Sequence, residues 1–306
     1  MRQALRRNLC LLSLLSMVCF ASACKKPQRP GIVIGSKFFT EQVILAELLA
    51  QHIEGRTGIP VERKTNLGGT LLVHKALLAG DLDLYVEYTG TALTAVLNEP
   101  PDRSSMTADH GSSNSTYQRV SQLYGNRFNL ELTEPLGFEN TFAMVIRGED
   151  AKNLHLHTIS DIVPFASKWR AGVGYEFLER PDGFRGWTDL YQLHFVGQPR
   201  VMDLGLIYRA LVNRQVDLVA GNSTDGLIDA LGLVALVDDR HYFPRYDAVP
   251  IVRKSTLARF PQLRVALREL GGIISESDIR KLNYAVDALH QDPAAVVREF
   301  RLSKGL

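Results

Sequence analysis

An aromatic side chain and two hydroxyls follow a short apolar run near the end of the first hundred residues. Residues 81–93 have the sequence D-L-D-L-Y-V-E-Y-T-G-T-A-L, and the first half is typical of a buried strand. The polar turn at residues 89–91 predicts that a helix begins near Ala92. Ligands of open α/β sheets bind beyond the carboxyl ends of the strands. We therefore expect Tyr88 and the groups after it to form half of a small-molecule site.

The same order of elements recurs in the second half of the chain. A-L-L-A-G-D-L-D-L at residues 76–84 is echoed by A-L-V-N-R-Q-V-D-L at residues 210–218. A polar turn at residues 221–226 follows the second copy. Two similar α/β halves that face each other would form a cleft. The alternative is that the two segments are alike only because helix, turn and strand commonly follow one another with such residues, and it explains the similarity equally well.

Strands alternate with helices along the chain, which predicts an α/β fold with mainly parallel sheets and flanking helices. Thr40 is the expected N-cap of the helix that follows the first strand. Polar segments around residues 138 and 246 each lead into an apolar strand, and we expect the chain to cross between two lobes there. The predicted domains are therefore residues 31–138 plus 246–306 for lobe 1 and 139–245 for lobe 2.

The N-terminus has the pattern of a secretory signal. A basic start precedes an apolar run and the residues A-S-A-C, so that residues 1–23 are a predicted signal peptide. Small residues before Cys24 resemble a bacterial lipobox, which predicts a lipidated Cys24, a membrane anchor and a polar tether at residues 24–30. Ala21 stands where leucine is usual, and plain cleavage near Ala23 is the alternative.

Composition excludes several classes of function. The chain has 306 residues, and without the signal peptide it keeps 32 basic and 33 acidic residues, so no nucleic-acid surface is expected. Cys10 and Cys19 leave with the signal, which removes disulfides and cysteine metal clusters from the folded part. The sequence has no G-x-S-x-G nucleophile elbow, no H-E-x-x-H zinc-binding motif and no phosphate-binding loop motif. We expect no enzyme activity, no metal and no cofactor.

Seven motifs together resemble one family. They are G-S-K-F-F-T-E-Q (35–42), Y-V-E-Y-T-G-T-A-L (85–93), G-F-E-N-T-F-A (137–143), D-G-F-R-G (182–186), M-D-L-G-L-I-Y (202–208), N-S-T-D-G (222–226) and F-P-R-Y-D-A-V-P (243–250). This set resembles the substrate-binding proteins of ABC importers for glycine betaine, choline and carnitine. The resemblance implies a two-lobed, type II periplasmic-binding-protein fold that closes around its ligand and delivers it to an ABC permease and ATPase. The alternatives are an anchored ligand sensor without transport and a binder of a different polar solute.

The resemblance also implies which residues bind the ligand. Aromatic faces hold a quaternary ammonium by cation–π attraction, and relatives commonly use four tyrosines. These positions fall on Tyr88, Phe142, Asn222 and Tyr246, so that one ring lacks the hydroxyl and another is replaced by an amide. The complete set of expected ligand-binding residues is Lys37, Tyr88, Thr91, Asn140, Thr141, Phe142, Asn222 and Tyr246.

Lys37 and Asn222 suggest a ligand with polar groups beyond its trimethylammonium head. If Lys37 points into the cleft, it repels a bare cation such as choline and favours a betaine with a carboxylate. Importers with G-S-K at this place include some for larger betaines such as ergothioneine. Lys37 in solvent and Tyr88 and Tyr246 as ordinary packing residues are the alternatives.

Overall fold

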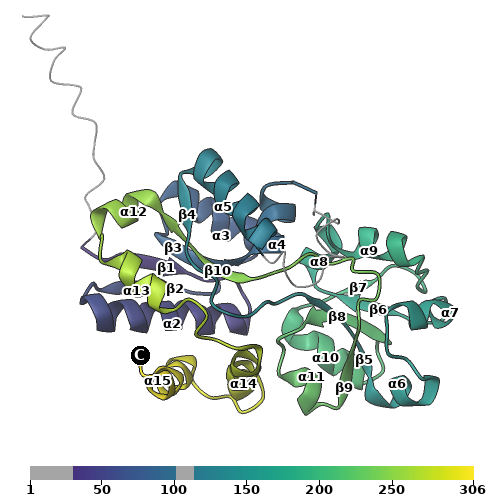
Figure 1. Ribbon diagram of the computed structural model, residues 1–306. Coiled ribbons are helices and arrows are strands. Elements are labelled where there is room, and N and C mark those ends of the chain that lie inside the picture. Colours follow the sequence, from purple (N-terminus) through teal and green to yellow (C-terminus); the bar gives the residue numbers. More distant parts are fainter. Residues whose placement is uncertain (1–29, 101–113) are drawn as a thin grey trace, which may run out of the picture. The chain divides into compact units, whose positions relative to one another are not determined.

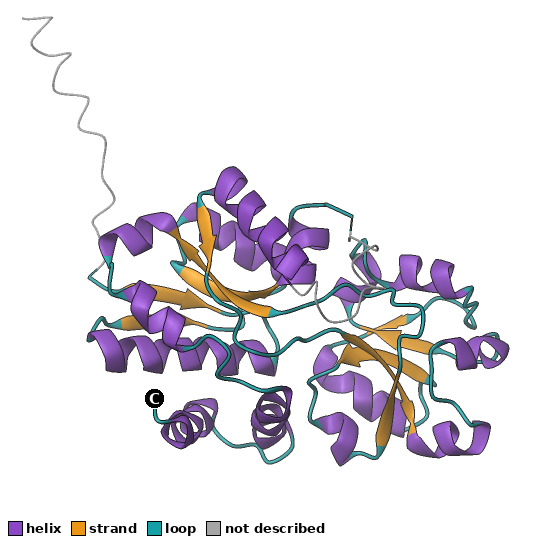
Figure 2. Cartoon of the chain, viewed as in Figure 1, coloured by secondary structure: helices purple, strands orange, loops and turns teal. Residues whose placement is uncertain are grey.

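The computed structural model describes residues 30–100 and 114–306. The signal peptide, Cys24 and most of the tether lie outside the described residues. Residues 32–306 form one compact unit that contains two five-stranded sheets with flanking helices (Figures 1 and 2). Within the described part of the chain, no helix has the length and apolar character needed to cross a membrane.

The first sheet has the strand order β2-β1-β3-β10-β4. β1 is parallel to both of its neighbours, and β10 is antiparallel to both of its own. Its strands are β1 (Ile32–Gly35), β2 (Val61–Lys64), β3 (Leu84–Tyr88), β4 (Leu130–Leu132) and β10 (Ala248–Arg253). The accompanying helices are α2 (Thr40–Thr57), α3 (Thr70–Ala79), α4 (Thr89–Thr91), the π-helical turn η2 (Ala92–Val96), α5 (Asn114–Phe128), α12 (Lys254–Arg259), α13 (Leu263–Glu269), α14 (Glu276–Asp287) and α15 (Pro293–Lys304). We call this sheet with its helices the first lobe.

The second sheet repeats the topology with the order β7-β6-β8-β5-β9. Its strands are β5 (Phe142–Arg147), β6 (Ala171–Val173), β7 (Arg200–Val201), β8 (Leu218–Asn222) and β9 (Leu233–Leu236). Its helices are α6 (Gly148–Leu154), the 3-10 turn η4 (Ser160–Ile162), α7 (Val163–Ala166), α8 (Tyr175–Glu179), α9 (Phe184–Tyr191), α10 (Leu204–Val212) and α11 (Leu227–Ala230). This second lobe confirms that the echo noted in the sequence marks equivalent elements, since α3–β3 and α10–β8 hold the same place in the two sheets.

Each sheet lies between two apolar cores because successive strand residues point to opposite faces. In β3, Leu84, Val86 and Tyr88 face the core that α2 covers, whereas Tyr85 faces a second core that includes Tyr124 of α5. Burial on both faces explains why β3 is apolar at nearly every position. Burial on both faces therefore fixes the pairing register of β3 with its neighbours, and with it the face of the sheet to which Tyr88 points.

Two extended segments connect the lobes and run antiparallel to each other. The outgoing segment enters β5 and the returning segment enters β10, and Glu139 forms an isolated bridge with Asp247. The amide of Asn140 donates to the carbonyl of Tyr246 at 3.1 Å, and the amide of Ala248 donates to the carbonyl of Phe138 at 3.0 Å. The two segments therefore form a paired connection between the sheets.

The structure confirms the two-lobed α/β fold but corrects two details of the sequence prediction. The sheets are mixed rather than mainly parallel, because the strand that arrives from the other lobe runs against its neighbours in each sheet. Thr40 is not the N-cap of α2. Phe39 holds that position, and the Thr40 hydroxyl donates instead to Asp287 at 2.5 Å.

Candidate functional site

A cavity of about 300 Å³ lies between the lobes, a size that suits a small molecule. Its lining combines polar groups with seven aromatic side chains, namely Phe38, Phe39, Tyr88, Phe142, Tyr175, Phe177 and Tyr246. A lining of this kind matches an apolar, positively charged group, since aromatic faces attract cations without needing a hydrogen-bond donor.

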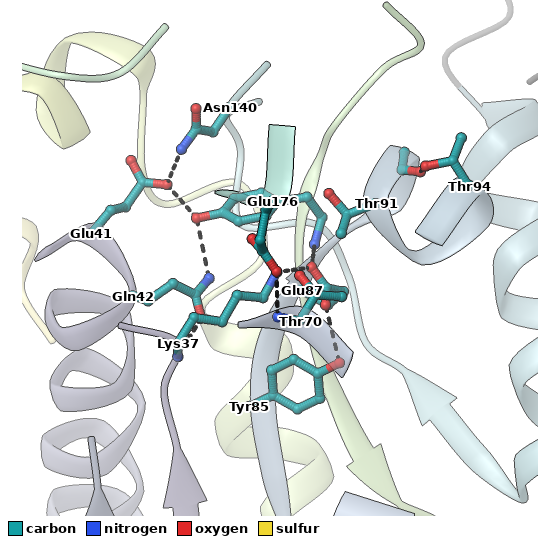
Figure 3. A network of polar contacts seen from close by, with 12 residues as sticks. Lys37, Glu41, Gln42, Thr70, Tyr85, Glu87, Thr91, Thr94, Asn140 and Glu176 are labelled. Carbon is teal, nitrogen blue, oxygen red and sulfur yellow. Dashed lines mark hydrogen bonds and ion pairs between the residues drawn. The ribbon is translucent and has the colours of Figure 1, made fainter. Parts of the chain in front are cut away.

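Tyr88 ends β3, and its ring is held in place by the first turn of α2. Its hydroxyl donates to Glu41 Oε1 at 2.5 Å and accepts from Gln42 Nε2 at 3.1 Å (Figure 3, in which Glu41 and Gln42 are labelled). Burial, with the Glu41 carboxylate as a second cause, raises the pKa of Tyr88 well above its usual value. The hydroxyl therefore stays protonated and anchored, and the ring contributes its face to the cavity.

Tyr246 lies on the segment that returns to the first lobe. Its hydroxyl donates to Asp182 Oδ2 at 2.6 Å, and its ring meets Phe142 edge to face with 6.1 Å between centroids. Gly90 permits this position, because a Cβ atom there would lie 2.7 Å from the Tyr246 ring and 2.8 Å from a backbone carbonyl. The turn after β3 thus packs against the Tyr246 ring on the returning segment.

Lys37 follows β1 and lines the cavity, as one of the two alternatives predicted. Its side chain is buried and its Nζ lies 5.1 Å from the centre of the Tyr88 ring. However, Nζ forms an ion pair with Glu87, a fully buried carboxylate that also accepts from the Tyr85 hydroxyl (Figure 3). The expected repulsion of choline by Lys37 is therefore largely cancelled within the protein.

Arg180 is the charged cavity residue with the most contacts among those that the sequence analysis did not predict, which also include Tyr175, Glu176 and Phe177. It lies between α8 and α9, and its guanidinium carbon is 4.9 Å from the Phe142 ring centre and 6.0 Å from that of Tyr246. Asp182 holds it with two hydrogen bonds of 2.8 and 2.6 Å. Burial alone would raise the pKa of Asp182, but the neighbouring guanidinium outweighs burial and lowers that pKa.

The two lobes contact each other across the cavity through polar bonds. Arg180 Nη1 donates to Thr91 Oγ1 at 3.1 Å, and the amide of Thr70 donates to Glu176 Oε1 at 2.7 Å. The second bond places a carboxylate of one lobe at the N-terminus of helix α3 in the other, where anions are favoured. Thr91, Arg180 and Glu176 all line the cavity.

The remaining predicted residues cluster where β5 begins and β8 ends. Phe142 and Asn222 are cross-strand partners and both line the cavity. Asn140 also lines it and donates to Glu41 Oε1 at 2.9 Å. Thr141 does not line it, because strand alternation points its side chain elsewhere, and its backbone pairs with Ser223.

Seven of the eight predicted side chains therefore share one cavity. They are Lys37, Tyr88, Thr91, Asn140, Phe142, Asn222 and Tyr246. Whether they contact a ligand stays a prediction. In the described part of the chain, no group of three or more His, Cys, Asp or Glu side chains is placed to hold a metal ion.

Comparison with known proteins identifies the family. Residues 30–302 match the model of the substrate binding domain of the ABC-type glycine betaine transport system.

The chain belongs to this family.

It is therefore a transport binding protein and not an enzyme, as the sequence predicted. The carnitine transport binding protein OpuCC of Listeria monocytogenes is 35% identical over 94% of this chain and 92% of its own length. The ergothioneine transport permease and binding protein EgtU of Helicobacter pylori is 32% identical over 90% of this chain but only 48% of its own length. A solved glycine betaine/carnitine/choline ABC transporter structure, 32% identical, covers 90% of this chain and 98% of its own with a TM-score of 0.74.

For a binding protein of this family, the charges around the cavity are informative. Lys37 and Arg180 each have a carboxylate partner, so these two pairs are neutral overall. Glu176 and Asp203 also line the cavity; neither forms an ion pair within the described part of the chain, although the Glu176 charge contributes to the raised pKa of Arg180. The surroundings are therefore acidic on balance, which favours a cationic ligand group, while guanidinium N–H groups remain at one end of the cavity.

Proposed function

We propose that this binding protein binds a betaine. The trimethylammonium group of the ligand would contact the rings of Tyr88, Phe142 and Tyr246, and its carboxylate would accept hydrogen bonds from Arg180. The observation that carries the proposal is the position of Arg180 beside these rings. Three of its five N–H groups donate to Asp182 and Thr91, which leaves one N–H on each Nη without a bond in the described part of the chain. Two such donors suit the two oxygens of a carboxylate.

A betaine should therefore bind more tightly than choline. Both ligands offer a trimethylammonium group, but choline carries a hydroxyl where a betaine carries a carboxylate. Since Lys37 is neutralised by Glu87, the preference arises mainly from Arg180 and Thr91 and only secondarily from Lys37. The relatives whose names specify carnitine and ergothioneine support this direction, because both of those molecules are zwitterions.

Isothermal titration calorimetry with choline, glycine betaine, carnitine and ergothioneine tests the proposal. The protein should first be unfolded and refolded to remove any co-purified ligand. We expect heat of binding from at least one carboxylate-bearing ligand and weaker binding of choline. Tightest binding of choline would contradict the role given to Arg180, and no binding of any of the four would contradict the ligand class.

Ligand binding should bring the two lobes together. The paired crossings would act as a two-segment hinge with few residues. The bonds that Arg180 donates to Thr91 and that the Thr70 amide donates to Glu176 join the lobes across the cavity, and closure around a ligand would form them. Small-angle scattering should show a decrease in radius of gyration on saturation with ligand. An unchanged radius would exclude closure about residues 138 and 246 as the mechanism.

We further propose that Cys24 is lipidated after removal of residues 1–23 and anchors the protein at the membrane, where an ABC permease and ATPase receive the ligand. The A-S-A-C sequence supports this assignment. Metabolic labelling with a palmitate analogue should mark the wild-type protein and not the Cys24→Ala variant. Equal labelling of both would exclude this anchor.

A further inference from the structure

Glu41 is a buried carboxylate in the first turn of α2 that holds the hydroxyl of Tyr88. Its Oε1 accepts from the Tyr88 hydroxyl at 2.5 Å and from Asn140 Nδ2 at 2.9 Å, and its Oε2 accepts from Asn283 Nδ2 at 3.0 Å (Figure 3, in which Glu41 and Asn140 are labelled). These bonds join the end of β3, the outgoing crossing and helix α14. Together they fix both oxygens of the carboxylate.

The charge of Glu41 has no cationic partner. All three of its donors are neutral, and no lysine, arginine or histidine among the described residues forms an ion pair with it. Glu41 also lines a second cavity, of about 350 Å³, which adjoins the cavity between the lobes, hereafter the first cavity. The other charged residues that line the second cavity are Asp203 and Asp225, both carboxylates. A buried charge is costly unless it is paired, so Glu41 is hydrogen-bonded but its charge is not compensated.

The cation nearest to the Tyr88 ring does not compensate Glu41 either. Lys37 Nζ lies 5.1 Å from the centre of this ring, but it forms its ion pair with Glu87. The pair is neutral overall. The surroundings of the Tyr88 ring therefore keep the negative charge of Glu41.

Two amide groups add to this negative potential. Asn140 and Asn283 each turn their amide nitrogen toward Glu41. Their amide oxygens are buried and accept no hydrogen bond within the part of the chain that the structure describes. Asn140 also lines the first cavity, so its side chain joins the buried carboxylate to the cavity wall.

We propose that Glu41 is a positioning residue that makes the first cavity selective for positive charge, by holding the Tyr88 ring and supplying the negative charge that a cationic ligand group offsets. Cation–π attraction is electrostatic, and a hydroxyl that donates to a carboxylate makes its ring more negative. An uncharged group of the same shape gains nothing from Glu41. This inference rests on the proposed function only in that a trimethylammonium group contacts Tyr88, and it does not require the contact of a carboxylate with Arg180.

The test compares ligands that have the same shape but differ by one charge. In tert-butylacetate a carbon atom replaces the ammonium nitrogen of glycine betaine, and tert-butylethanol is the same analogue of choline. Dissociation constants are measured by NMR titration, which is suited to weak as well as tight binding. We define charge selectivity as the ratio of the dissociation constant of the neutral ligand to that of the cationic ligand. On the wild-type protein the cationic member of a pair should bind far more tightly.

Two variants assign the charge selectivity to Glu41. Glu41→Gln removes the charge with little change in shape, so the cationic ligands should weaken roughly tenfold and the neutral ligands should change less than about twofold. Glu41→Asp keeps the charge but moves it away from the Tyr88 hydroxyl, so charge selectivity should decrease by a smaller factor. This second variant also decides the question if Glu41→Gln fails to fold. Glu62→Gln, which removes a carboxylate at an exposed position of β2, is the matched control and should change neither pair.

The outcomes separate this inference from the proposed function. Equal losses for cationic and neutral ligands in the Glu41 variants would show that Glu41 only supports the cavity wall, and unchanged binding would also overturn the inference. If the wild-type protein binds choline but not glycine betaine, the contact of a carboxylate with Arg180 is wrong, while the choline pair still tests Glu41. If it binds neither trimethylammonium ligand, the proposed function and this inference both fail.

Discussion

β3 and β8 occupy the same place in the two sheets, yet they end in different chemistry. Each is a five-residue strand that follows a helix and lies between a parallel and an antiparallel neighbour. The last residue of β3 is Tyr88 and the last residue of β8 is Asn222, and both line the first cavity.

Each of the two residues is backed by a carboxylate. Behind Tyr88, Glu41 accepts the tyrosine hydroxyl and fixes the ring. Behind Asn222, Asp225 accepts from the asparagine backbone, and the tyrosine that binds this carboxylate, Tyr208, belongs to α10. The difference teaches that topology fixes where the cleft lies, while the residue at the strand end decides what it binds. Tyr88 offers an aromatic face for a cation, whereas Asn222 at the equivalent position offers hydrogen bonds.

The largest expected effect comes from removing the ring at the end of β3. Tyr88→Ala loses a cation–π contact of about 2 kcal/mol and part of an apolar wall, so all trimethylammonium ligands should bind roughly a hundredfold more weakly. Asn222→Ala, the change at the equivalent position, should alter the affinity for glycine betaine by less than about threefold. Calorimetry on both variants checks the contrast, and similar losses in both would remove the proposed division between the lobes.

Replacement of Arg180 sharpens the comparison by asking which lobe binds the carboxylate. A hydrogen bond to a charged group contributes about 1.5–3 kcal/mol, so Arg180→Gln should weaken glycine betaine roughly tenfold to a hundredfold. Choline should lose much less, because it has no carboxylate. Arg180→Lys keeps the ion pair with Asp182 and controls for its loss. If choline and glycine betaine weaken in parallel, Arg180 supports the cavity without selecting the ligand.

A smaller effect is expected from the turn after β3. Gly90→Ala places a Cβ atom against the Tyr246 ring and should displace it, which we expect to weaken betaine binding several-fold. Gly125→Ala in helix α5 is the control, because the nearest atom to a Cβ added there would be Lys254 Nζ at 3.5 Å. That change should leave binding intact and slightly stabilise the protein. An unchanged affinity in Gly90→Ala would mean that the position of the Tyr246 ring is not critical.

The smallest effect concerns a contact between the lobes outside the aromatic rings. Glu176→Ala removes the carboxylate that accepts from the Thr70 amide at the start of α3. An anion at a helix N-terminus contributes about 0.3–1 kcal/mol, so affinity should fall about two- to fivefold. On the proposal that this contact forms as the lobes close around the ligand, the melting temperature without ligand should change little. A large loss of ligand-free stability would show that the lobes are already joined in the unliganded protein.

The sequence predicted the fold from local patterns, and it predicted part of the cavity lining from the family resemblance. The turn after β3 marked Tyr88 and Thr91 in the sequence itself. The family resemblance supplied Lys37, Asn140, Phe142, Asn222 and Tyr246. Thr141 was placed in the set with its neighbours, but strand alternation turns it away from the cavity.

The missing features depend on contacts between residues far apart in the chain. Lys37 and Glu87 are separated by 50 positions, so nothing near Lys37 indicated that its charge is neutralised. Arg180 precedes a Pro-Asp-Gly turn, which has no signal for a binding residue, and its bond to Thr91 spans 89 positions. The antiparallel strands were missed because only the crossing between lobes reverses the direction in which β5 and β10 enter their sheets.

A crystal structure with bound glycine betaine tests the central claim most directly. The account predicts that the trimethylammonium group lies against the rings of Tyr88 and Tyr246, with the carboxylate oxygens within hydrogen-bond distance of Arg180. The methylene group should then lie on the side of Asn222. A ligand whose carboxylate contacts Asn222, with Arg180 bound only to Asp182 and Thr91, would contradict the assignment of the two lobes.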